Sequence, residues 1–118
     1  MQEIEHLETL TKLDELWLGR NRITEIKNLA ALTSVRQLSL QANRLETMRG
    51  IHVMTGLEEL YLSQNGITRI EDLQPLTKLS ILDLAHNAVE TVRASHMRVP
   101  ARTPTHWSGP SVRAYAHL

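Results

Sequence analysis

The chain has 118 residues, which is enough for one domain, and it contains 13 Lys and Arg, 13 Asp and Glu and no Cys. All the acidic residues lie at or before Glu90, whereas residues 93–118 hold four Arg and no acid. The acidic body argues against nucleic acid as a partner, since phosphate binding needs clustered Lys and Arg. The lack of Cys favours a reducing compartment, and neither a signal peptide nor a membrane span is visible. We therefore expect an intracellular protein, in the nucleus or the cytoplasm.

Repeats of 22 residues organise the first three quarters of the chain. A half repeat at residues 1–12 precedes repeats at 13–34, 35–56, 57–78 and 79–92, which follow the pattern LxxLxLxxNxIxxI with aliphatic variants. A fixed period of this length indicates a solenoid, and the pattern resembles the leucine-rich repeat. We expect one solenoid domain over residues 1–92, which binds a partner on its concave face.

The first half of each repeat alternates between apolar and variable residues, which predicts a short strand with one buried face. Successive strands are joined by more than a dozen residues, so they must pair in parallel. In the second half, apolar residues recur every three positions, as at Ile23, Ile26, Leu29 and Leu32. This spacing fits a 3₁₀ turn better than an α-helix. The predicted fold is an α/β repeat solenoid with a concave parallel β-sheet and a convex side of 3₁₀ or short helical turns.

One Asn follows each predicted strand, at the position where the chain turns out of the sheet. Its amide hydrogens can bind carbonyl groups of neighbouring repeats, so we interpret these residues as a structural ladder rather than as a binding site. The members of this ladder are Asn21, Asn43, Asn65 and Asn87.

Residues 93–118 contain three of the four prolines and show no apolar period. Such a composition buries too little surface to offset the entropy of ordering, so we predict a disordered tail rich in Pro and Arg. No motif of nucleophilic, phosphate-binding or metal-dependent catalysis occurs, and the six His are widely spaced. We expect no enzyme activity, no catalytic residue, no metal and no cofactor.

Residues 1–92 resemble one branch of the repeat superfamily. The stretches LDELWLGRNRITEI, LSLQANRLE, LEELYLSQNGITRIEDL and LSILDLAHNAVETV are similar to the later repeats of the leucine-rich-repeat regulatory subunit of protein phosphatase 1. Residues 93–118 match no part of it. The resemblance implies a shortened, non-catalytic regulatory scaffold that docks the catalytic subunit of the phosphatase on its concave face. It also places an aromatic contact at Trp17 and an acidic contact at Asp83.

Alternation within the strands adds further candidates on the same face. The residue between the second and third Leu of each repeat points outward, as does the residue two positions earlier. Exposed aromatic residues are favoured binding anchors. The predicted partner-binding residues are Trp17, Ser39, Tyr61, Asp83, Glu15 and Glu59.

Two other interpretations remain open at this point. The chain could be a leucine-rich-repeat adaptor for another nuclear or cytoskeletal protein, or a gene-model fragment without a function. The sequence does not decide whether binding activates or inhibits the phosphatase, and it gives no oligomeric state.

Overall fold

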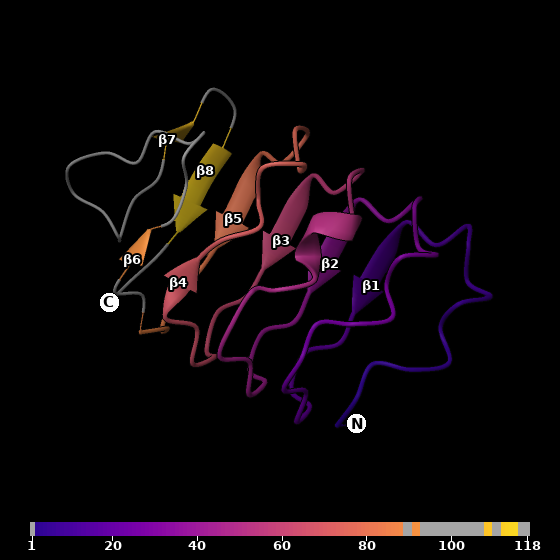
Figure 1. Cartoon of the computed structure of the whole chain (residues 1–118), viewed down its shortest axis with the longest axis horizontal. Helices are drawn as coiled ribbons and strands as arrows, with labels where there is room; N and C mark the ends of the chain where they lie inside the picture. The colour runs from indigo at the N-terminus through magenta and orange to yellow at the C-terminus, as the bar shows by residue number, and fades with distance from the viewer. Residues whose placement is uncertain (1, 89–90, 93–107, 110–111, 116–118) are drawn as a thin grey trace.

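The computed structural model of this protein describes residues 2–88, 91–92, 108–109 and 112–115. Its main sheet has the strand order β1-β2-β3-β5-β8-β7, and the first four of these strands follow one another across the molecule in chain order (Figure 1). Their bounds are β1 Glu15–Trp17, β2 Gln37–Ser39, β3 Glu59–Tyr61 and β5 Ile81–Asp83. They pair in parallel, as predicted.

The register repeats every 22 residues, because Leu16 pairs with Leu38, Leu38 with Leu60, and Leu60 with Leu82. A second sheet of two parallel strands joins β4 (Arg69–Ile70) to β6 (Thr91–Val92) and keeps the same offset. The sequence period is therefore the physical spacing of the rungs.

The second half of each repeat turns in steps of three residues. Backbone N–H groups of Leu32, Leu57 and Leu76 donate to the carbonyl oxygens three residues earlier, at 3.0 Å in each case. In one repeat these turns become the 3₁₀ helix η1 (Ile51–Val53). The predicted 3₁₀ character of this side is confirmed. No helix in the part of the chain that the structure describes is long and apolar enough to cross a membrane.

Aliphatic side chains from both halves of the repeats fill the space between sheet and turns. Leu38, Leu60 and Leu82 from the strands and Leu45 and Ile67 from the turns are fully buried. The half repeat before β1 extends this core, since Ile4 is also buried and its carbonyl accepts a hydrogen bond of 2.7 Å from Asn28 Nδ2.

The structure differs from the prediction in residues 93–118. Two short strands lie there, β7 (Ser108–Gly109) and β8 (Val112–Tyr115), and β8 pairs in parallel with β5. These six residues form strands, and the prediction of a disordered tail as a whole stays a prediction, because the other residues of 93–118 lie outside the described part of the chain. Ile81 pairs with Arg113, 32 residues later rather than 22. A strand edge offers backbone groups to any extended segment, so pairing does not require the Leu pattern.

Each ladder Asn from the second repeat onward joins two repeats. Asn43 Nδ2 donates to the carbonyl of Leu40 in its own repeat (2.9 Å) and to that of Leu18 in the preceding one (3.0 Å). Its Oδ1 accepts the backbone N–H of Ile23 at 3.0 Å. Asn65 and Asn87 make the equivalent bonds one and two repeats later. For Asn21, the bonds shown lie within its own repeat, to Leu18 and Gly19.

Two corners in each repeat have left-handed backbone. The first corner immediately precedes the ladder Asn, and the second lies in the second half of the repeat. The residues at the first corner are Arg20, Ala42, Gln64 and His86, and those at the second are His6, Asn28, Gly50 and Asp72. Only one of these eight is glycine. A Cβ at Gly50, where φ is 99°, would lie 2.2 Å from the carbonyl oxygen of Ile26.

Replacing Asn43 by Leu should lower the free energy of unfolding by roughly 1–3 kcal/mol, because the Ile23 N–H and the carbonyls that Asn43 binds lose their partner. Chemical denaturation measures this loss. The exposed neighbour Gln41 provides the control, and Gln41→Leu should change stability by less than about 0.5 kcal/mol. Equal effects in both variants would contradict a ladder role for Asn43.

Gly50→Ala should be destabilising by about 2 kcal/mol or more, because the new Cβ meets the backbone of the preceding repeat and the left-handed conformation itself disfavours it. Gly66→Ala is the matched control, since a Cβ there would lie 3.4 Å from the nearest atom, the carbonyl oxygen of Leu45. Thermal unfolding followed by circular dichroism should separate the two variants. A Gly50→Ala protein as stable as Gly66→Ala would rule out the contact.

Candidate protein-binding face

The outward side chains of β1, β2, β3 and β5 form two columns on one face of the main sheet, which we call the concave face. The first column, at the end of each strand, consists of Trp17, Ser39, Tyr61 and Asp83. The second, at the start of each strand, consists of Glu15, Gln37, Glu59 and Ile81. Strands lie about 4.8 Å apart, so each column runs roughly 14 Å across four rungs.

The aromatic residues of this face are each tied to a carboxylate on the same strand. Trp17 Nε1 donates to Glu15 Oε1 at 3.2 Å, and the Tyr61 hydroxyl donates to Glu59 Oε1. In both pairs the partners are two positions apart, as two residues on one face of a strand must be. The structure therefore brings together four of the predicted partner-binding residues as two aromatic–carboxylate pairs.

The two aromatic residues differ in how much surface they offer. Trp17 is 62% exposed, which is high for so large an apolar side chain, whereas Tyr61 is half-buried. Trp17 contributes most of the apolar area available to a partner on this face.

Ser39 does not present the surface that the sequence predicts for it. Its residue is only 2% exposed, although it lies on the concave face between Trp17 and Tyr61 in the register. The reason is size, because a short side chain flanked at strand spacing by two large aromatic residues is covered by them. Ser39 therefore lies on the floor between Trp17 and Tyr61, and its role in partner binding stays a prediction.

Asp83 lies at the end of the first column and is half-buried. Its Oδ1 accepts the backbone N–H of Ala85 at 3.0 Å, which fixes the carboxylate at the point where β5 ends. One oxygen is thus held by the chain itself, and the carboxylate keeps further acceptor capacity for a donor from a partner.

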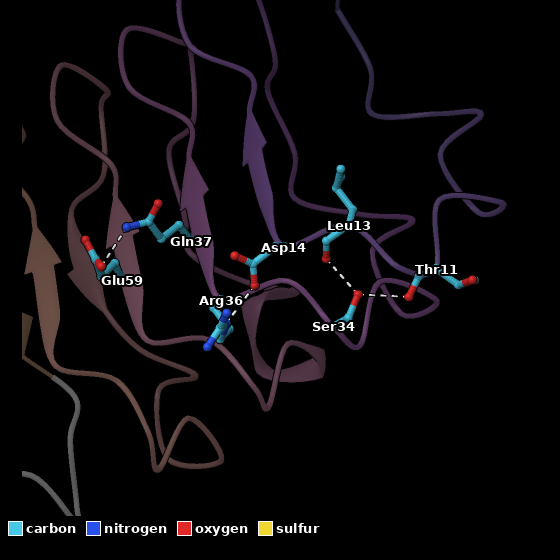
Figure 2. A network of polar contacts seen from close by, with 7 residues as sticks. All are labelled: Thr11, Leu13, Asp14, Ser34, Arg36, Gln37 and Glu59. Carbon is cyan, nitrogen blue, oxygen red and sulfur yellow. Dashed lines mark hydrogen bonds and ion pairs between the residues drawn. The ribbon is translucent and has the colours of Figure 1, made fainter.

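Polar contacts between repeats hold the start of the strands (Figure 2). Arg36 Nε donates to Asp14 Oδ1 at 2.6 Å, and this bond together with the negative charges of Asp14 and Glu58 raises the pKa of Arg36. Beside it, Ser34 Oγ is placed 2.6 Å from the carbonyl of Leu13 and 2.8 Å from that of Thr11. These contacts join the first repeat to the half repeat and to the second repeat.

Gln37 connects two neighbouring strands within the second column, through a bond that the sequence pattern does not predict. Its Nε2 donates to Glu59 Oε2 at 2.6 Å across neighbouring strands (Figure 2). Glu59 thus accepts bonds on both oxygens, from Tyr61 and from Gln37, and these bonds hold its pKa below the ordinary value of 4.5 against the opposing effect of burial. Aligning the repeats shows which residues are neighbours, but not which side chains reach one another.

No group of His, Cys, Asp and Glu in the described residues is arranged to hold a metal ion. Two depressions on the described surface lie beside the half repeat, one lined by Glu5, His6 and Asn28 and the other by Thr9 to Leu13, and neither is lined by residues of the two columns. What the concave face offers is a shallow surface of aromatic, amide and carboxylate groups, which suits contact with another protein.

Comparison with known proteins agrees with this architecture. Residues 55–94 match the family described as Leucine Rich repeats (2 copies). Among solved structures, internalin C2 of Listeria monocytogenes superimposes with a TM-score of 0.70 at 29% identity over 75% of this chain and 39% of its own. Internalin InlF of the same species gives a TM-score of 0.68 at 24% identity, over 78% of this chain and 31% of its own. The chain thus has the fold of a leucine-rich-repeat solenoid.

A curated relative shows which leucine-rich-repeat protein part of this sequence resembles. Over 39 residues, one third of the chain, the sequence is 49% identical to the Protein phosphatase 1 regulatory inhibitor subunit PPP1R7 homolog of Arabidopsis thaliana. The chain resembles a segment of a protein phosphatase 1 regulatory subunit. The matched stretch spans 12% of that relative's length.

Tyr61→Phe should raise the pKa of Glu59 toward its ordinary value, because the largest contribution that lowers it is the hydroxyl bond. An NMR titration of the Glu side-chain carboxyl carbons measures this shift directly. A lowered pKa stabilises the fold above the ordinary pKa, and the contribution disappears as the pH falls through the folded value. The wild type should therefore lose more stability than Tyr61→Phe on acidification below about pH 4.5. In Trp17→Phe, which removes only the bond to Glu15, the Glu59 titration should stay unchanged.

Proposed function

We propose that this protein is a non-catalytic scaffold that docks the catalytic subunit of protein phosphatase 1 on its concave face. The observation that carries the proposal is the pair of aromatic–carboxylate groups, Trp17–Glu15 and Tyr61–Glu59, on the outward side of the sheet. The likeness to a phosphatase regulatory subunit suggests which partner this surface takes.

The contacts within the face support the proposal physically. Hydrogen bonds already hold Trp17, Tyr61 and Glu59 in place. Binding a partner would therefore cost less entropy than it would if these three side chains were mobile beforehand. Trp and Tyr are also the side chains most often found at the energetic centre of protein interfaces. Trp17 and Tyr61 would serve as anchors, Asp83, Glu15 and Glu59 would receive cationic or N–H groups, and Ser39 would act only as the floor between the anchors.

The size of the face limits the affinity that we expect. A stable interface buries roughly 1,600 Å² in total, with 20–30 residues on each side. Four strands of three residues provide fewer outward side chains than that. Binding should therefore be weaker than that of a longer solenoid of the same kind. A nuclear or cytoplasmic location is part of this proposal.

Titration calorimetry of the folded chain against the phosphatase catalytic subunit tests the proposal. Trp17→Ala should weaken binding roughly tenfold, because an exposed aromatic anchor is lost, and Asp83→Lys should weaken it by a similar factor. Circular dichroism should show both variants folded, since Trp17 lies outside the core and Asp83 is only half-buried.

Glu46→Lys is the control for charge, because it makes the same change of net charge at an exposed site away from both columns of the concave face. Its affinity should equal that of the wild type. If all three variants bound the phosphatase like the wild type, the concave face would not be the docking site. If the folded wild type gave no heat at high concentration, an adaptor for another protein would become the better interpretation.

A further inference from the structure

Three exposed arginines lie together on a flank of the solenoid that the phosphatase proposal does not use. Arg20 and Arg22 follow β1, and Arg44 follows β2, so all three lie where the chain leaves the sheet. We call this set the arginine flank. It lies at the opposite end of the strands from Asp14 and Glu58.

Backbone hydrogen bonds between repeats hold the arginine flank in place. The N–H of Arg20 donates to the carbonyl of Gln41 at 2.9 Å, and the N–H of Arg44 donates to the carbonyl of Ile23 at 2.9 Å. The ladder residue Asn21 lies between Arg20 and Arg22 in the chain, and Asn43 immediately precedes Arg44. The side chains therefore extend from a fixed backbone.

None of the three guanidinium groups has a carboxylate within ion-pair distance among the residues that the structure describes. Two other cations are paired, because Arg36 contacts Asp14 at 2.6 Å and Lys27 contacts Glu3 at 3.3 Å. Glu46, two residues after Arg44, makes no such contact with it. Within the part of the chain that the structure describes, the N–H donors of these three guanidinium groups are thus available to a partner.

The repeat brings like charges close together on this flank. Arg22 and Arg44 hold the same position in adjacent repeats, whose strands are in register and about 4.8 Å apart. Neighbouring like charges repel, and a carboxylate between them would remove the repulsion while accepting paired N–H bonds from the planar guanidinium groups. An extended peptide with successive acidic side chains matches a row of cations at this spacing.

We propose that the arginine flank is a second docking surface, which binds an acidic peptide segment of a protein partner through its carboxylates. The start of the strands, with Asp14 and Glu58, would repel the same segment, so an acidic segment would lie along the flank rather than across the sheet. This proposal does not depend on the identity of the protein that binds the concave face.

Fluorescence anisotropy with a labelled oligoglutamate peptide tests the proposal on the whole chain. The wild type should bind the peptide, and the affinity should fall as salt is added, because exposed charge pairs are screened. In the double variant Arg22→Glu/Arg44→Glu, binding should be roughly tenfold weaker or lost, since two attractions become repulsions. The affinity of Arg22→Gln/Arg44→Gln for the peptide should lie between that of the Arg22→Glu/Arg44→Glu variant and that of the wild type.

A matched control separates this site from the net charge of the chain. Arg49→Glu/Lys78→Glu makes the same total change at two exposed cations outside the arginine flank, and it should bind oligoglutamate like the wild type. An equal loss in both double variants would overturn the proposal, as would a folded wild type that binds no peptide at low salt. Tighter binding of a DNA oligonucleotide of matched charge would also overturn it. Trp17→Ala should leave peptide binding unchanged, so failure here is distinguishable from failure of the phosphatase proposal.

Discussion

The hydrogen bonds of the ladder Asn residues are the constraint on which the rest of the structure depends. Asn43, Asn65 and Asn87 each bind backbone carbonyls in their own repeat and in the one before, and each accepts an N–H from the preceding repeat. A buried backbone group without a partner is costly, so this side chain fixes how far each rung is displaced from the last. The aliphatic core then packs in one register only.

That register produces the functional surfaces. Because equivalent residues stack at strand spacing, the sheet assembles Trp17, Tyr61 and Asp83 into one column, through pairings between residues 22 positions apart. The same stacking sets Arg22 beside Arg44 on the arginine flank and Arg36 between Asp14 and Glu58 at the other end of the strands. One spacing therefore organises aromatic, acidic and basic side chains on different sides of the sheet.

Periodicity predicted the features that are the same in every repeat. The parallel strands, the three-residue turns and the position of each ladder Asn follow from the 22-residue period alone. Periodicity could not predict the features that depend on one particular neighbouring side chain. Ser39 is buried because of the sizes of Trp17 and Tyr61, and the Gln37–Glu59 bond depends on side-chain reach. The strand β8 was missed because it pairs through backbone groups, which leave no apolar pattern. The left-handed corners were missed because glycine, their usual sign, occurs at only one of them.

The left-handed corners affect the stability of the solenoid, and most of them lie outside its recognition surfaces. Seven non-glycine residues in the described part of the chain adopt positive φ, and each such residue costs about 1 kcal/mol relative to an ordinary conformation. The corners lie outside the two columns of the concave face, at the bends between the straight segments. Arg20 is the one corner residue that also belongs to the arginine flank, whereas Ala42 and Gln64, for example, belong neither to a column nor to that flank. Substitutions at the corners other than Arg20 can therefore change the stability of the solenoid while the recognition surfaces keep their composition. A repeat protein of this kind can change partners without losing its fold.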